Sequence, residues 1–365
     1  YTAPRNLLEA KLSQLFEDVL NNGHIGIQDN FFDHGGHSLK ATVLMSRIAK
    51  EFHVQVSLKD IFAHPTVEGL ALIIREAEQN LYAAIEPAEE RDTYPVSSAQ
   101  KRIYVLQQLD EGVAYNMPAV LELEGALDVA KLSAVCKELI NRHEPLRTSF
   151  VSGADDEPVQ RIHTEVPFTL SKETTIEGFV RPFDLSQAPI FRAGLIEVSN
   201  EKHVLLVDMH HIISDGVSVQ LLIREFTDLY ANRQLKPLRI QYKDYAVWQQ
   251  KFKKGDSYQK QETYWQQQFS GDLPILELPT DKRRPAERQF IGGKVTFQLD
   301  KEITARIKRL AHKNRSTLYM TLLALYSAFL SRLSGQDDIV IGSPIAGRPH
   351  ADLEAVLGMF VNTLA

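Results

Sequence analysis

A buried strand, a polar turn and an amphipathic helix follow one another near the middle of the chain, and this succession constrains its fold most. The run 204–209 is apolar except at Asp208, as expected of a buried strand. Beyond Gly216, apolar residues recur at three- and four-residue spacing, which predicts a helix with one apolar face. The sequence therefore predicts α/β structure in which a strand ends at His210 and His211 and a helix begins shortly after them.

The turn after this strand holds side chains that can do acid–base chemistry, namely His210 and His211. Neutral imidazole has a pKa near 6.5, so at pH 7 it can accept a proton from an amine, hydroxyl or thiol. Asp215 is placed to bind local backbone N–H groups or a cation, and Gly216 allows a positive φ. A structural role for the histidines and zinc ligation stay open as alternatives, although Cys136 is far away in the sequence.

The composition excludes several classes of protein. With 365 residues, 44% of them hydrophobic, the chain can form two or three domains with sizeable cores. The net charge of −6 arises from interspersed acidic and basic residues, which argues against nucleic acid and anionic membranes as partners. The single cysteine, Cys136, excludes an intrachain disulfide and fits a reducing cytoplasm. The longest apolar stretch, 318–330, is too short for a membrane span and predicts a buried helix.

Residues 1–80 have the pattern of a small all-α domain. Apolar residues recur with helical spacing in three segments, 8–19, 39–52 and 67–74. Three helices in a segment of this length form a small helical bundle. Residues 81–93, which are rich in alanine and glutamate, follow as a linker. If flexible, about 13 residues span roughly 20 Å root-mean-square and hold the flanking domains at an effective concentration on the order of millimolar.

A glycine-rich turn, DNFFDHGGHSL, lies between the first two predicted helices. Gly35 and Gly36 allow the backbone to turn sharply, and Ser38 falls at the N-terminus of the second helix, near the positive end of its dipole. A serine at such a place is most commonly a helix N-cap. A hydrolase nucleophile elbow is a weaker alternative, because Lys40 stands where that motif has a glycine.

This first block resembles the peptidyl carrier (thiolation) domains of peptide synthetases, in which a serine after a double glycine carries 4'-phosphopantetheine. The resemblance implies that Ser38 is the attachment residue, modified by a phosphopantetheinyl transferase. The helix N-terminus would favour the incoming phosphate. His34 departs from the family pattern, which usually has an apolar residue before the glycines.

From Tyr94 onward the pattern becomes mixed α/β, with a helix opening at 98–105, a strand at 119–123 and a helix at 129–141. A charged stretch follows, in which Arg142 and Arg147 flank a glutamate. Such charge density beside a helix end is usually a solvated turn. The two arginines can also form buried ion pairs that fix a scaffold.

Several segments of this second block together resemble the condensation domains of nonribosomal peptide synthetases, relatives of chloramphenicol acetyltransferase. The matching motifs are SSAQKRIYVL at 97–106, RHEPLRTSF at 142–150, MHHIISDGVS at 209–218, YKDYAVW at 242–248 and GMFVNT at 358–363. The resemblance implies two α/β lobes facing each other across a tunnel. We expect the first lobe at 94–266 and a second, incomplete lobe at 267–365, with a strand at 294–299 and a helix at 316–333. The chain would then be a piece of a longer polypeptide.

The implied reaction is peptide-bond formation. The amine of an acceptor aminoacyl thioester attacks the carbonyl of a donor thioester, and both are held on pantetheine arms. Because the carrier precedes the condensation domain, Ser38 would deliver the donor, loaded by an upstream adenylation domain. The acceptor would come from a downstream carrier domain outside this chain.

The resemblance also implies roles for the residues of the turn. His211 would position the attacking amine and act as general base. Asp215 would be structural, paired with either Arg348 or Arg142. The N–H of Gly216 could help to hold the developing oxyanion.

Two other functions are weighed against condensation. An epimerisation domain shares the histidine turn, but the RHEPLRTSF stretch and the histidine before Ser38 favour condensation. A non-catalytic carrier-docking domain would be expected to lose His211 or Asp215, and both are present.

Overall fold

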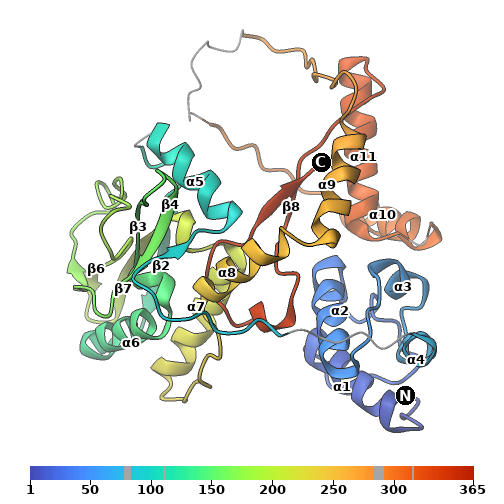
Figure 1. Ribbon diagram of the computed structural model, residues 1–365, viewed down its shortest axis with the longest axis horizontal. Helices are drawn as coiled ribbons and strands as arrows, with labels where there is room; N and C mark the ends of the chain where they lie inside the picture. The colour runs from blue at the N-terminus through green and yellow to red at the C-terminus, as the bar shows by residue number, and fades with distance from the viewer. Residues whose placement is uncertain (78–83, 110–111, 283–291, 315) are drawn as a thin grey trace.

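The computed structural model of the chain describes residues 1–77, 84–109, 112–282, 292–314 and 316–365. The first domain is all helical, as predicted, and its helices (blue) lie apart from the sheets in Figure 1. They are α1 (Leu7–Leu20), α2 (Ser38–Phe52), α3 (Leu58–Ala63) and α4 (Val67–Glu76). The sequence predicted three of them and missed α3, because its six residues are too few to display helical periodicity.

One apolar cluster fills the interior of this domain. Phe16 of α1, Leu44 of α2 and Leu70 of α4 are fully buried in it. Phe31, from the turn ahead of α2, is also fully buried and meets Phe16 edge-on, with 5.2 Å between ring centroids. The glycine-rich turn is therefore anchored to the core of the domain by its first phenylalanine.

Two sheets form the first lobe of the second domain, and the predicted strand before the histidines lies in the larger one. The order there is β2-β7-β6-β5, and β7 pairs antiparallel with both neighbours. The strands are β2 (Ala119–Glu124), β5 (Ser171–Lys172), β6 (Phe191–Ser199) and β7 (Lys202–Met209), with β1 (Tyr94–Pro95), β3 (Thr148–Ser152) and β4 (Pro158–Ile162) in the smaller sheet. The strands predicted at 119–123 and 204–209 are confirmed.

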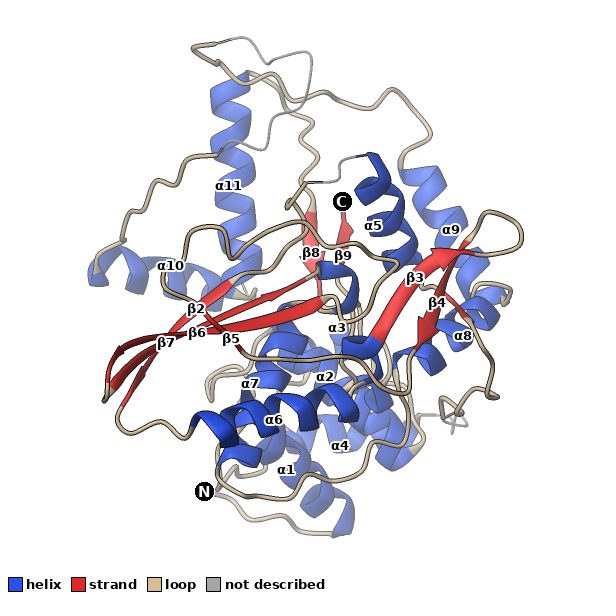
Figure 2. Cartoon of the chain, turned by 90° about the vertical axis from the view of Figure 1, so that its left-hand side faces the viewer, coloured by secondary structure: helices blue, strands red, loops and turns tan. Residues whose placement is uncertain are grey.

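Two helices, α6 (Val129–Arg142) and α7 (Gly216–Tyr230), lie on one face of the larger sheet (Figure 2). Leu132 of α6 and Phe226 of α7 pack in one apolar cluster with Leu205 of β7. Both helices were predicted from their apolar faces. Because α7 is held against the sheet, its first turn is fixed beside the end of β7.

The remaining elements are mostly helical. They are α5 (Ser98–Leu109), α8 (Tyr242–Phe252), α9 (Asp256–Gln268), α10 (Lys301–Lys313), α11 (Leu318–Ser334), the short helices η1 (Glu144–Arg147) and η3 (Ala351–Leu353), and the paired strands β8 (Ser343–Ile345) and β9 (Asn362–Leu364). The strand predicted at 294–299 is wrong: these residues have no regular structure, and Val295 and Phe297 are exposed. An alternating pattern forms a strand only where another strand offers it an edge, and no described strand pairs with this segment.

Helix α11 forms where the long apolar stretch predicted a helix, but it is not buried. Leu325, Tyr326 and Phe329 are each about half exposed. The prediction of a buried helix at this place is therefore wrong. Among the described residues, no helix is both long and apolar enough to cross a membrane.

The described part of the linker, 84–93, is anchored at Ile85. The side chain of Ile85 is fully buried in a cluster with Phe360, and its N–H donates to the carboxylate of Asp352. The span calculated for a flexible linker does not apply to this segment. The linker residues 81–83 lie outside the described residues.

Candidate functional site

Backbone hydrogen bonds to the segment before β2 fix the end of β7. The N–H of Met117 donates to the C=O of Met209 (2.8 Å), and the N–H of His211 donates to the C=O of Tyr115 (2.7 Å). The chain then forms the short 3-10 helix η2 (His211–Ile213). Both imidazoles therefore start from a backbone that is held by a second segment of the chain.

His210 is fully buried, and both of its ring nitrogens have partners. Its Nδ1 accepts the N–H of Ile212 (3.2 Å), and its Nε2 therefore carries the proton and donates to Oε1 of Gln107 (3.1 Å). Burial and, to a smaller extent, the neighbouring His211 together lower the pKa of His210 to about 4. His210 is thus a neutral histidine whose hydrogen bonds hold the turn.

His211 is half-buried, and one of its ring nitrogens is committed to the protein. Nδ1 lies 2.7 Å from the C=O of Ser214, so it carries the proton and donates it to that oxygen. This bond fixes both the tautomer and the orientation of the ring, and it leaves a lone pair on Nε2. Of the two imidazoles, His211 is the one arranged to accept a proton.

Asp215 joins the turn to a distant segment of the chain. Its Oδ1 accepts the N–H of Ser218 (2.8 Å), which makes Asp215 the N-cap of α7, and its Oδ2 accepts the N–H of Phe360 (3.0 Å). Oδ1 also lies 3.5 Å from Nη2 of Arg348. The sequence left two arginines as possible partners, and the structure selects Arg348, since Arg142 lies elsewhere.

The side chain of Arg348 is only 8% exposed, because the loop that follows it contacts the guanidinium. Its Nη1 donates to the carbonyls of Leu353 and Val356 (2.6 Å each), and its Nη2 donates to Oγ of Ser218 (2.9 Å). The guanidinium lies over the ring of Phe360, 3.9 Å from its centroid. Burial lowers the pKa of Arg348, while Asp215 opposes this effect. The segment from Arg348 to Phe360 therefore braces the histidine turn.

Gly216 begins α7, and the reason inferred for it from the sequence is wrong. Its φ is not positive, because it is the first residue of the helix. A Cβ built on Gly216 would meet nothing within 4 Å, and the residue is exposed. The glycine therefore lies at an open, exposed position at the start of α7.

The charged stretch after α6 is a buried scaffold rather than a solvated turn. Nε of Arg142 and Nε2 of His143 bond the same oxygen of Glu225, at 3.0 and 2.6 Å. Burial raises the pKa of Glu225, but these two bonds outweigh it and hold the pKa below its usual value. Nη2 of Arg147 lies 3.7 Å from Oε1 of Glu144, so the two arginines pair with different carboxylates.

Ser38 is the first residue of α2, and it is partly exposed. The cap position belongs to His37, whose side chain makes no capping hydrogen bond, so the N-cap alternative for Ser38 is wrong. Both glycines before it are required by the turn. Gly35 has a φ of +89°, and a Cβ on Gly36 would lie 2.3 Å from the ring of Phe31. The backbone is therefore shaped to present the serine hydroxyl at an uncapped helix N-terminus, which fits a covalently attached phosphate.

Two residues that hold the site, Gln107 and Phe360, were not identified as functional from the sequence. Gln107, the partner of His210, carries no signal because it lies just beyond a motif. Phe360 lies inside the GMFVNT motif, but its contact with Asp215 crosses a long stretch of chain. Cys136 is buried, and burial raises the pKa of its thiol to about 11. Within the described parts of the chain, no group of three or more His, Cys, Asp and Glu residues could hold a metal ion.

Comparison with known proteins agrees with this arrangement. Residues 90–365 match the condensation domain family, and residues 10–74 match the phosphopantetheine attachment site family. A plipastatin synthase polypeptide of Bacillus subtilis (strain 168) is 99% identical over 365 residues, which are 100% of this chain and 10% of that protein. Tyrocidine synthase 3 of Brevibacillus parabrevis is 46% identical over 374 residues, covering 100% of this chain and 6% of that protein. The chain thus spans a tenth or less of the length of these two relatives.

A solved structure shows the same fold. The crystal structure of the X-domain from teicoplanin biosynthesis superposes with a TM-score of 0.70 at 29% identity, over 77% of this chain and 67% of that one. The predicted fold, a helical bundle followed by a two-lobed α/β domain like that of chloramphenicol acetyltransferase, is confirmed. The match to the attachment site indicates that the first domain carries covalent 4'-phosphopantetheine. The chain therefore belongs to the condensation domain family of nonribosomal peptide synthetases, with a phosphopantetheine carrier domain ahead of its condensation domain.

Proposed function

We propose that this chain forms an amide bond between a donor acyl group held at Ser38 and the amine of an acceptor aminoacyl thioester. The observation that carries the proposal is the tautomer of His211, whose Nδ1–H is committed to the C=O of Ser214. The lone pair on Nε2 is therefore free to orient an attacking amine and accept its proton. The phosphopantetheine group supplies a thiol on which the donor is held as a thioester.

Ser38 is proposed as the attachment residue because its hydroxyl is partly exposed and α2 has no side-chain cap. An uncapped N-terminus of a 15-residue helix favours a phosphate through its free N–H groups and its dipole. On this basis residues 1–80 form the carrier, 81–93 the linker, and 94–266 and 267–365 the two lobes.

The other residues of the turn hold His211 in place or serve the reacting carbonyl. Gly216 is the exposed first residue of α7, and its N–H is proposed to donate to an oxygen that gains negative charge. His210 fixes the strand end through Gln107, and Asp215 with Arg348 fixes the start of the helix. These residues orient the site and do not exchange protons.

The proposal implies partners beyond this chain. An upstream adenylation domain supplies the donor, a downstream carrier domain supplies the acceptor, and a phosphopantetheinyl transferase modifies Ser38. The single cysteine, which is buried and unpaired, fits a reducing cytoplasm as the place of action.

The test starts from the chain incubated with coenzyme A and a broad-specificity phosphopantetheinyl transferase, with Ser38→Ala as control. Intact-protein and peptide mass spectrometry should find one pantetheine, on the Ser38 peptide alone. The chain is then loaded with an aminoacyl group and mixed with a separately aminoacylated carrier, and the expected product is a dipeptidyl group on that second carrier. A folded chain that takes no pantetheine contradicts the carrier assignment, and a loaded chain that forms no amide contradicts the condensation assignment.

A further inference from the structure

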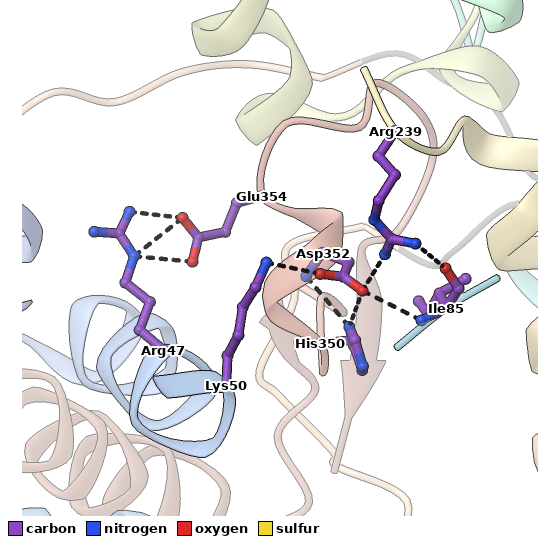
Figure 3. Close-up of polar contacts among 7 residues, drawn as sticks. All are labelled: Arg47, Lys50, Ile85, Arg239, His350, Asp352 and Glu354. Atoms are coloured by element: carbon purple, nitrogen blue, oxygen red, sulfur yellow. Dashed lines mark hydrogen bonds and ion pairs between the residues drawn. The ribbon is translucent and has the colours of Figure 1, made fainter. Parts of the chain in front are cut away.

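Four charged side chains join the carrier to the condensation domain (Figure 3). Arg47 of α2 donates to both oxygens of Glu354, from Nη2 at 2.6 Å and from Nε at 3.0 and 3.2 Å. One turn further on, Nζ of Lys50 donates to Oδ1 of Asp352 (3.0 Å). The two cations are three residues apart and share one face of α2, and the two carboxylates lie at η3. Two cations on α2 thus face two carboxylates at η3.

Among the residues that the structure describes, no buried apolar cluster spans this contact. The buried apolar cluster of the carrier contains only residues 12–74, with its flanking residues in 8–77. The cluster beside Asp352 contains Ile85, Tyr242 and Phe360, all from the linker and the condensation domain. Partly exposed ion pairs without apolar burial give a weak contact that salt screens. The carrier is therefore docked reversibly rather than fused to its neighbour.

When the carrier is released, Asp352 keeps other bonding partners and Glu354 can be hydrated. Asp352 is buried, but it is also bonded by the guanidinium of Arg239 and by the N–H of Ile85, both of which stay with the condensation domain. Burial raises the pKa of Asp352, but the bonds from Lys50 and the Ile85 N–H outweigh it and hold the pKa below its usual value. Glu354 and Arg47 are both partly exposed, so water can replace each partner.

The contact uses the end of α2 that is remote from Ser38. Arg47 and Lys50 follow Ser38 by nine and twelve residues, which is about 14 and 18 Å along the helix axis. Eight residues lead from Ala77 to the anchored Ile85. Fully extended, they span at most about 29 Å, so Ala77 at the end of the carrier stays within that distance of Ile85 while Ile85 is anchored. Docking therefore restrains the carrier by its far end and by a short tether.

We infer that Asp352 and Glu354 are a docking site by which the condensation domain recognises its own carrier. The recognised feature is a pair of cations one turn apart on α2. The docked carrier is in a resting position that leaves the Ser38 end of the helix accessible. A carrier without this pair of cations does not dock here.

Domain motion in the unmodified 365-residue chain tests the docking site without any chemistry. At low ionic strength, ¹⁵N relaxation should show the carrier tumbling with the condensation domain. Arg47→Glu and Glu354→Arg should each release it to tumble as an independent domain, and the double variant that combines them should restore joint tumbling. Lys59→Glu, a charge reversal of an exposed lysine on α3, is the matched control and should change nothing. Joint tumbling in both single variants, or failure of the double variant to restore it, overturns the inference.

Access to Ser38 is tested with Glu354→Arg, which releases the carrier without altering any carrier residue. The initial rate of pantetheine transfer from coenzyme A should equal that of the wild-type chain, because docking leaves Ser38 open. A clearly faster transfer in Glu354→Arg would show that docking covers Ser38 and would overturn that part of the inference. Because domain motion is measured before any modification, its outcome is independent of whether Ser38 is the attachment residue.

Discussion

The two helix N-termini that hold the chemistry of this chain are built in opposite ways. Helix α7 begins behind Asp215, whose buried carboxylate is shared by two backbone N–H groups and Arg348. Helix α2 begins behind His37, which is exposed and makes no capping bond. The N-terminus of α7 is held by contacts from three parts of the chain, and we call it the locked terminus. The N-terminus of α2 has no side-chain cap, and we call it the open terminus.

The difference follows from what each terminus must do. A group that orients a substrate works best when neighbouring bonds hold it in a single geometry, as Ser214 and Asp215 do around His211. An attachment serine has to enter the active site of a modifying enzyme and then travel with its domain. Exposure of Ser38 and weak docking of α2 both serve that movement.

The largest expected effect concerns the locked terminus. His211→Ala should lower the rate of amide formation by about 10²- to 10⁴-fold, because the general base is removed. The ring is half-buried and is held by one bond to Ser214, so the fold should persist. Single-turnover kinetics with a donor loaded at Ser38 measure the effect. A decrease well below this range would show that His211 positions the amine without taking its proton.

The two cap positions should differ sharply in stability. Asp215→Ala leaves Arg348 buried without its carboxylate and should lower the free energy of unfolding of the condensation domain by roughly 3–5 kcal/mol. The same truncation at α2, His37→Ala, should change the free energy of unfolding of the carrier domain by no more than about 0.5 kcal/mol. Urea unfolding followed separately for each domain gives both values. Similar losses at both positions would remove the contrast between the termini.

The buried His210 should make the locked terminus sensitive to acid. Its pKa is about 4 in the folded chain and near 6.5 when unfolded, so the unfolded state binds the proton first as pH falls. Neutral His210 therefore contributes fully to the free energy of unfolding above pH 6.5. This contribution, about 3 kcal/mol, should be lost as the pH falls from 6.5 to 4. Urea unfolding across this range should show a flatter profile for His210→Gln than for the wild type. Identical profiles would contradict a buried neutral His210.

The smallest expected effect is a gain at the open terminus. His37→Ser places a hydroxyl where α2 has no capping bond and should stabilise the carrier by about 1 kcal/mol. Thermal unfolding of the carrier domain measures it, with His37→Ala as the reference. An unchanged melting temperature would show that the free N–H groups of α2 are already satisfied.

Local patterns in the sequence were sufficient for most helices and for the strand that leads to the histidines. Helices α1, α6 and α7 have enough turns for their apolar faces to be visible, whereas α3 is too short. The strand predicted at 294–299 was wrong because pairing depends on a partner that a local pattern does not contain.

The candidate residues could be named from the sequence, but their partners could not. Arg348 and Arg142 were equal candidates for Asp215, and only the fold separates them, since Arg142 is held by Glu225. Likewise, the ion pairs of Arg47 and Lys50 cross about 300 residues of sequence, so no spacing indicates them.

The most direct test of the account is a covalent capture between the two termini. The chain is loaded at Ser38 with a pantetheine that ends in an alkylating electrophile, and the products are mapped by peptide mass spectrometry. We predict a cross-link from Ser38 to Nε2 of His211, absent in His211→Ala. A fully loaded chain that gives no such cross-link, or gives it elsewhere with His211 untouched, would contradict the claim that these two residues meet.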